Sequence, residues 1–260
     1  MIDNYGSVIF NLIYLAIIWI ILIIVAAKNT KKEKPSEWKF AFWSFFFLGF
    51  GDLFHLLSRT FVFFQSMNYS EGQEAYYVLD STIFWIGLGL MMTSITVQFF
   101  YVGMYYYWRV AEKQKRMKMN SISEDEAECS FLLMDLLVIS SLIVRIVLIF
   151  YPQNKYGYPT EDLNVFRLIT NIPLYILGIL VIYLFLKRSS DKTAEIPGFS
   201  DVEKKVARQS AIWIIVSYVC YSLTISLSWW NPLFGMFMIP KTIAYLVVLF
   251  IFYKYKLILN

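Results

Sequence analysis

The sequence has few charged residues, two cysteines and one histidine, and each shortage argues against a class of protein. Only 16% of the residues are charged while 58% are hydrophobic, which excludes an ordinary water-soluble domain and a disordered tail. Cys129 and Cys220 are too few and too far apart for a disulfide framework. The single histidine, His55, provides no zinc signature and none of the histidine pairs of intramembrane metal hydrolases. We therefore expect no metal and no cofactor.

Long apolar segments are abundant instead. A helix needs about 20 mostly apolar residues to cross roughly 30 Å of hydrocarbon, because lipid satisfies no backbone hydrogen bond. Seven segments meet or nearly meet this length: Val8–Ala27, Phe40–Phe64, Thr82–Trp108, Phe131–Tyr151, Phe166–Leu186, Ser210–Ser228 and Leu233–Tyr253. The connections are too short for an independent core. The sequence therefore predicts an all-α, single-domain, polytopic integral membrane protein with seven transmembrane helices and no soluble domain.

The basic residues predict the orientation of these helices. One side of the predicted bundle carries Lys28, Lys31, Lys32, Lys34, Lys39, Arg109, Lys113, Lys115, Arg116, Lys118, Lys187, Arg188, Lys192, Lys204, Lys205, Arg208, Lys254 and Lys256. The connections on the other side carry only Lys155. The positive-inside rule then places the N-terminus outside and the C-terminus in the cytoplasm. Because the positive charge is explained by topology and lies beside acidic residues, we expect the lipid bilayer, and not nucleic acid, as its partner.

Four basic residues remain inside the predicted spans, and one of them, Arg167, lies near enough to the outer boundary to snorkel. The other three, Arg59, Arg145 and Lys241, fall in the outer halves of their helices, roughly 8 to 12 Å below the outer interface at about 1.5 Å per residue. Ionisable groups at such depth are costly, so we expect them to face the interior of the bundle. Asp52 is the clear buried anion against these three cations. A net positive, outward-opening cavity would attract a carboxylate, phosphate or sulfate group.

The second predicted span carries the densest polar row. Asp52, His55 and Arg59 are spaced three, four and seven positions apart and therefore share one helix face. The imidazole of His55 is suited to proton transfer or to hydrogen bonding a ligand, with Asp52 one turn deeper to orient it. The same row is also consistent with an internal network that only fixes helix packing.

Weaker signals come from three other spans. Thr93 and Thr96 lie near the predicted midplane, where hydroxyls most often bond to their own backbone or to a neighbouring helix. Asn171 precedes Pro173, and Pro240 precedes Lys241 at a similar depth. A proline inside a helix removes one hydrogen bond and can leave a carbonyl free for a ligand. We include Thr93, Thr96 and Asn171 with Arg59, Arg145 and Lys241 as candidate ligand-binding residues.

Two classes of function follow from these candidates. The first is a binding protein of receptor or transporter type, with a cation-lined intramembrane pocket for an anionic or amphiphilic small molecule. The second is an intramembrane enzyme acting on a lipid or isoprenoid, with His55 as acid and base and Asp52 orienting it. A third reading is a structural or assembly partner whose polar network only fixes the fold.

Two resemblances bear on these alternatives. A lysine in the seventh span, Lys241, is similar to the retinal lysine of microbial rhodopsins, but the position one turn earlier holds Phe237 and no acid, and the resemblance is architectural only. The motifs Gly51-Asp52-Leu53-Phe54-His55-Leu56-Leu57-Ser58-Arg59 and Ile239-Pro240-Lys241-Thr242 resemble those of uncharacterised bacterial seven-span membrane proteins. That resemblance covers most of the chain, implies a bacterial cytoplasmic membrane and brings no activity with it.

Overall fold

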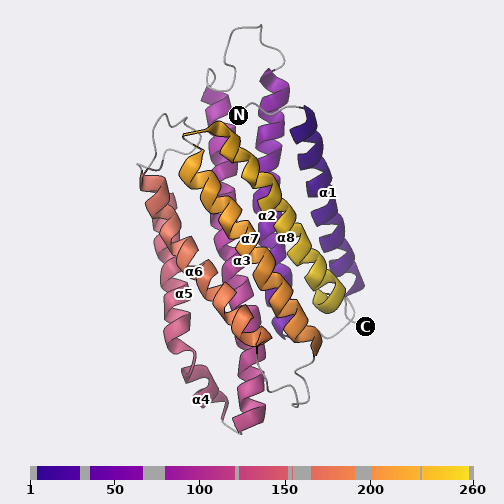
Figure 1. The fold of residues 1–260 in the computed structure, drawn as a ribbon, viewed down its shortest axis with the longest axis vertical. Helices are drawn as coiled ribbons and strands as arrows, with labels where there is room; N and C mark the ends of the chain where they lie inside the picture. Colours follow the sequence, from indigo (N-terminus) through magenta and orange to yellow (C-terminus); the bar gives the residue numbers. More distant parts are fainter. Residues whose placement is uncertain are drawn as a thin grey trace.

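A computed structural model of the chain describes residues 5–29, 36–66, 80–120, 123–151, 154, 165–190, 201–228 and 230–257. Over these residues the protein is helical, and seven of its helices are long and apolar enough to cross a membrane (Figure 1). This confirms the predicted seven-span membrane architecture. The elements are α1 (Tyr5–Lys28), α2 (Ser36–Ser66), α3 (Asp80–Asn120), α4 (Glu124–Cys129), α5 (Leu132–Ile149), α6 (Val165–Ser189), α7 (Asp201–Leu227), the 3₁₀ helix η1 (Pro232–Phe237), α8 (Met238–Phe252) and the π-helical turn η2 (Tyr253–Leu257).

Several helix boundaries differ from the predicted spans. α3 continues past Trp108 to Asn120, and α7 begins at Asp201 rather than at Ser210. Hydropathy marks where apolar residues end, whereas a helix continues as long as its backbone bonds and side-chain pairs support it. One such pair joins Arg116 to Glu112, four residues earlier, at 3.3 Å. Most of the connection predicted after the third span is therefore helical.

The turn between the last two spans contains an Asn231 cap followed by a short 3₁₀ helix. The side chain of Asn231 accepts a hydrogen bond from the backbone N–H of Leu233 at 2.9 Å, and Pro232 begins η1. Proline suits the first turn of a helix because its missing N–H would have no partner there. The seventh predicted span consequently starts as a 3₁₀ helix, and its α-helical part begins at Met238.

Small residues at seven-residue intervals hold α2 and α3 close together. We call this contact the α2–α3 seam; its members are Ser44, Gly51 and Ser58 on α2, and Gly103, Thr96 and Gly89 on α3. A Cβ atom added at Gly51 would lie 1.7 Å from Thr96 Oγ1, and one added at Gly103 would lie 2.1 Å from Ser44 Oγ. Small residues let transmembrane helix backbones approach closely. The seam therefore fixes how Asp52 and His55 are presented beside α3.

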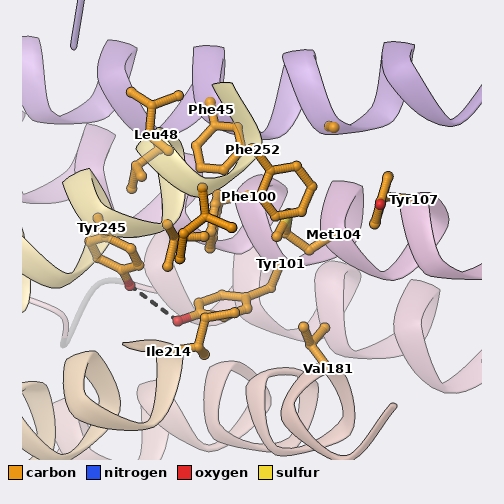
Figure 2. Close-up of a cluster of buried hydrophobic side chains, with 14 of the residues drawn as sticks. Phe45, Leu48, Phe100, Tyr101, Met104, Tyr107, Val181, Ile214, Tyr245 and Phe252 are labelled. Carbon is orange, nitrogen blue, oxygen red and sulfur yellow. Dashed lines mark hydrogen bonds between the residues drawn. The ribbon is translucent and has the colours of Figure 1, made fainter. Parts of the chain in front are cut away.

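Aromatic side chains fill the centre of the bundle. Figure 2 shows Tyr101 of α3 and Tyr245 of α8 pointing toward one another, with 3.1 Å between their hydroxyl oxygens. The ring of Tyr218 lies over Gly178, where an added Cβ would meet the Tyr218 hydroxyl oxygen at 1.7 Å. That glycine lets the Tyr218 hydroxyl donate to the carbonyl oxygen of Leu174 at 2.6 Å. These tyrosines join α3, α6, α7 and α8 in the middle of the protein.

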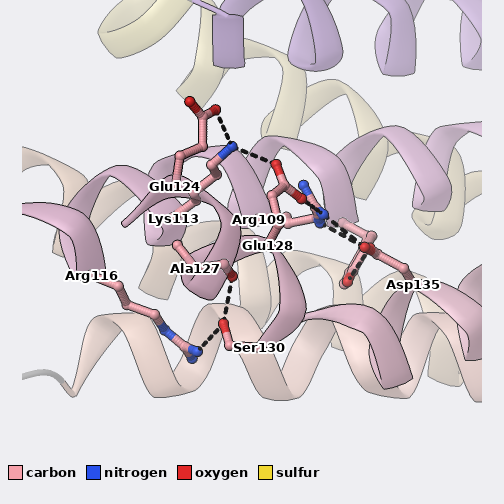
Figure 3. A network of polar contacts seen from close by, with 9 residues as sticks. Arg109, Lys113, Arg116, Glu124, Ala127, Glu128, Ser130 and Asp135 are labelled. Atoms are coloured by element: carbon pink, nitrogen blue, oxygen red, sulfur yellow. Dashed lines mark hydrogen bonds and ion pairs between the residues drawn. The ribbon is translucent and has the colours of Figure 1, made fainter. Parts of the chain in front are cut away.

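An ion network fixes α4 against the extension of α3 at the lower end of the bundle in Figure 1 (Figure 3). Arg109 pairs with Asp135 of α5 at 2.8 Å and also with Glu128, and Lys113 pairs with Glu124 at 2.7 Å and with Glu128. Hydrogen bonds from the Lys113 ammonium and the Arg109 guanidinium hold the pKa of the Glu128 carboxyl below its usual value. The basic residues here are thus neutralised within the chain itself.

Candidate functional site

Lys241 is a buried cation in the first turn of α8. Its side chain is only 7% exposed, and its Nζ lies 4.4 Å from the ring centre of Tyr221 and 5.8 Å from that of Tyr245. In the part of the chain that the structure describes, this ammonium forms no hydrogen bond and no ion pair. Aromatic faces attract a cation, but they do not replace the hydrogen bonds that three ammonium protons can donate.

A small cavity adjoins the Lys241 side chain. Its volume is about 10 Å³, close to the space that one water molecule needs. The lining comes from four helices: Val97 and Tyr101 of α3, Leu174 of α6, Tyr218 and Tyr221 of α7, and Lys241 and Tyr245 of α8. Lys241 is the charged member of this lining, and the other members are aliphatic or aromatic. The cavity therefore places one ammonium in an aromatic, water-sized space.

Arg145 is linked to this cavity through Asn171 and Tyr221. The Arg145 guanidinium is 1% exposed, donates to the carbonyl oxygen of Thr170, and donates from Nη2 to Asn171 Oδ1 at 3.0 Å. The Tyr221 hydroxyl donates to the same Asn171 oxygen at 2.8 Å. Asn171 therefore joins α5 to α7, and it holds the ring over which the Lys241 ammonium lies. Pro173 predicted a free carbonyl near Asn171, and in the structure the Thr170 carbonyl there accepts a hydrogen bond from the Arg145 side chain.

Asp52 lies on the α2 side of the same region. Its Oδ2 accepts a hydrogen bond from the Tyr14 hydroxyl of α1 at 2.5 Å, and the buried Thr93 hydroxyl lies beside it without hydrogen-bond geometry. Asp52 and Lys241 interact electrostatically, although they are not within ion-pair distance among the described residues. The Asp52 carboxylate thus offsets part of the positive charge of Lys241 without forming an ion pair with its ammonium.

The other predicted residues lie outside the cavity lining. His55 is 8% exposed and its backbone packs against Gly89, within electrostatic range of Arg59 and Lys241. Its imidazole forms no hydrogen bond to Asp52 within the described ranges, where Asp52 bonds to Tyr14 instead. The Thr96 hydroxyl donates to the carbonyl of Met92 at 2.9 Å, as membrane-helix threonines commonly do.

The structure therefore brings together a subset of the predicted site residues. Lys241, Asn171 and Arg145 form one connected group, and Asp52 interacts with it electrostatically. The tyrosines that complete the group, Tyr221 and Tyr245 among them, were not predicted from the sequence. Their signal was weak, because the chain has 19 tyrosines and many lie at helical spacing.

Comparison with known proteins adds no family. No family model, no curated protein and no solved structure matches this chain. Among the described residues, no cluster of three or more histidine, cysteine, aspartate or glutamate side chains is arranged to hold a metal ion.

Proposed function

We propose that this chain is a membrane-embedded binding protein, of receptor or transporter type, that binds a small anion or the anionic group of an amphiphilic molecule at Lys241. The observation that carries this proposal is the buried ammonium beside a cavity, with aromatic faces around it and no ion pair among the described residues. A charge in such surroundings is costly unless an opposite charge or hydrogen-bond acceptors accompany it. An anion in the cavity supplies both.

The surrounding contacts favour binding over catalysis. Asn171 of α6 accepts hydrogen bonds from Arg145 of α5 and from Tyr221 of α7, and the Lys241 ammonium lies over the Tyr221 ring. The site is therefore positioned by buried polar contacts on three helices. A preorganised site of this kind loses little entropy when a ligand binds. The enzymatic alternative needs His55 next to a bound substrate, and His55 is not part of the cavity lining.

We also propose the orientation and the membrane. The distribution of basic residues favours an external N-terminus and a cytoplasmic C-terminus. The motif resemblance favours the cytoplasmic membrane of a bacterium. With this orientation, the end of the bundle that carries α4 faces the cytoplasm. The opposite end, where α8 begins and Lys241 lies in its first turn, faces outward.

The two cysteines provide a direct test of orientation. Cys129 ends α4 and is exposed, whereas Cys220 is buried. A membrane-impermeant maleimide should therefore leave this protein unlabelled in intact cells and should label its Cys129 after permeabilisation. A Cys129→Ser variant should lose the label in both conditions, and adding Lys155→Cys to it should restore labelling from outside. Labelling of Cys129 in intact cells would reverse the orientation.

Anion binding is tested by thermal unfolding of the purified protein in detergent. We expect at least one of chloride, acetate, phosphate and dodecanoate to stabilise the wild-type chain, because a ligand at about 100 times its Kd adds about 2.7 kcal/mol. Lys241→Met should abolish the response. Lys205→Met is the matched control, since Lys205 also lies over a tyrosine ring, that of Tyr255 at 5.9 Å, but is exposed. An equal response of Lys241→Met and wild type would reject the proposal.

A further inference from the structure

The cavity beside Lys241 has features that narrow the class of anion. From its size and its limited set of donors, we infer that it is a binding site for a single halide ion, chloride in the first instance. This inference rests on the proposed function, because it names the ligand class of the same site. It also makes a stricter claim, since a carboxylate, phosphate or sulfate would satisfy the proposed function equally well.

Size is the first argument. A cavity of about 10 Å³ has room for about one water molecule. A halide is a single atom, larger than water but much smaller than an oxyanion, so it replaces that water when the lining side chains shift. Phosphate and sulfate have four oxygens around a central atom, and entry of either would require α3, α6, α7 and α8 to separate.

Donor supply is the second argument. Tyr218 donates its hydroxyl hydrogen to Leu174 O, and Tyr221 donates its hydrogen to Asn171 Oδ1, so both are committed. The Tyr101 and Tyr245 hydroxyls share one hydrogen bond, so at most one of their two hydrogens remains for an ion, in competition with the nearby Ser217 hydroxyl. The three hydrogens of the Lys241 ammonium diverge, so only one of them points at a single bound ion, and the lining offers that ion about two donors. That number suits one spherical ion and is too small for the oxygens of a tetrahedral oxyanion.

Charge is the third argument. Lys241 and Arg145, which is linked to it through Asn171 and Tyr221, carry two positive charges, and Asp52 carries one negative charge. This connected group therefore has a single positive charge in excess. One monovalent anion neutralises it, whereas a divalent anion would leave a buried negative charge without a partner.

The test uses purified full-length protein in a chloride-free gluconate buffer, titrated with sodium chloride, sodium bromide or sodium sulfate at constant ionic strength. Thermal stability and intrinsic protein fluorescence report binding. We expect saturable responses to chloride and bromide, and a much smaller response to sulfate. Lys241→Met should weaken halide binding by about 100-fold or more. A Tyr101→Phe and Tyr245→Phe double variant keeps the ammonium but loses the available hydroxyl hydrogen, and should weaken binding by about 10-fold.

The outcomes separate this inference from the proposed function. If halides are inert while acetate or dodecanoate stabilises the protein through Lys241, the halide assignment is wrong and the proposed function stands. If no anion acts through Lys241, both are wrong. Sulfate binding as tight as that of chloride also overturns the assignment. Should Lys241→Met fail to fold, the double tyrosine variant decides the question, since an unchanged halide affinity would place the ion elsewhere.

Discussion

Replacement of Asn171 by leucine should lower the free energy of unfolding by about 3 to 5 kcal/mol. Asn171 Oδ1 accepts hydrogen bonds from Arg145 at 3.0 Å and from Tyr221 at 2.8 Å. Its loss leaves the guanidinium of Arg145, which is 1% exposed, bonded to the Thr170 carbonyl, and the Arg145 Nε already has no hydrogen-bond partner among the described residues. Neutral hydrogen bonds between membrane helices average only about 0.6 kcal/mol, so a loss of several kcal/mol would identify the buried charge as its cause.

Unfolding in mixed micelles with increasing SDS measures this loss. Ile172→Leu is the matched control, because Ile172 is the next residue of α6 and its side chain is 50% exposed toward the surface of the bundle. Adding Arg145→Met to Asn171→Leu removes the unpaired charge and should recover much of the stability. A double variant less stable than Asn171→Leu alone, or an Asn171→Leu variant as stable as the control, would contradict this account.

The same substitution connects stability to the binding site. Tyr221 is held by Asn171, and the Lys241 ammonium lies 4.4 Å from the centre of the Tyr221 ring. Once Asn171 is lost, the Tyr221 hydroxyl loses this acceptor, and the contact that ties its ring to α6 is weakened. A site that depends on preorganisation should then bind its anion more weakly, even though Asn171 does not line the cavity.

The fold was predictable because membrane crossing imposes a strong physical constraint on composition. Each span needs a long apolar run, and the described residues contain seven such helices. Helix ends were less predictable. The extension of α3 beyond Trp108 is built from charged residues that pair with one another and with α4, and hydropathy is blind to such pairs. α4 begins with a capping box formed by Ser123 and Glu126. This is a recognisable sequence pattern three residues apart, but hydropathy does not detect it.

The candidate site was predictable only in part, for a different reason. Buried charge stands out in an apolar sequence, so Arg145, Lys241 and Asp52 were found. Which of them meet depends on helix rotation, and the sequence does not specify rotation directly. The row of Asp52 and His55 illustrates this: both lie on one face of α2, yet Asp52 bonds to Tyr14 of α1 while His55 packs against Gly89 of α3.

The α2–α3 seam brings these two helices close together, which leads to a second large effect. Gly51→Val should destabilise the protein by about 3 kcal/mol, because overpacking forces the backbones apart. An added Cβ at this position meets Thr96 Oγ1 at 1.7 Å, Thr96 Cβ at 2.9 Å and the backbone Cα of Thr93 at 3.2 Å. Side-chain rotation can relieve the first contact, but the other two require α2 and α3 to separate.

Compensation by the partner helix distinguishes the seam from a general loss of stability. Thr96→Gly removes the two nearest atoms, so the double variant should regain much of the stability that Gly51→Val loses in the same SDS titration. Leu57→Val is the control on α2, since that side chain is 43% exposed. Absence of any rescue would show that the contacts of the α2–α3 seam do not set the distance between these two helices. Because Asp52 follows Gly51 directly, separation of the two helices should also displace the carboxylate from Thr93, and the anion affinity of the Lys241 site should change with it.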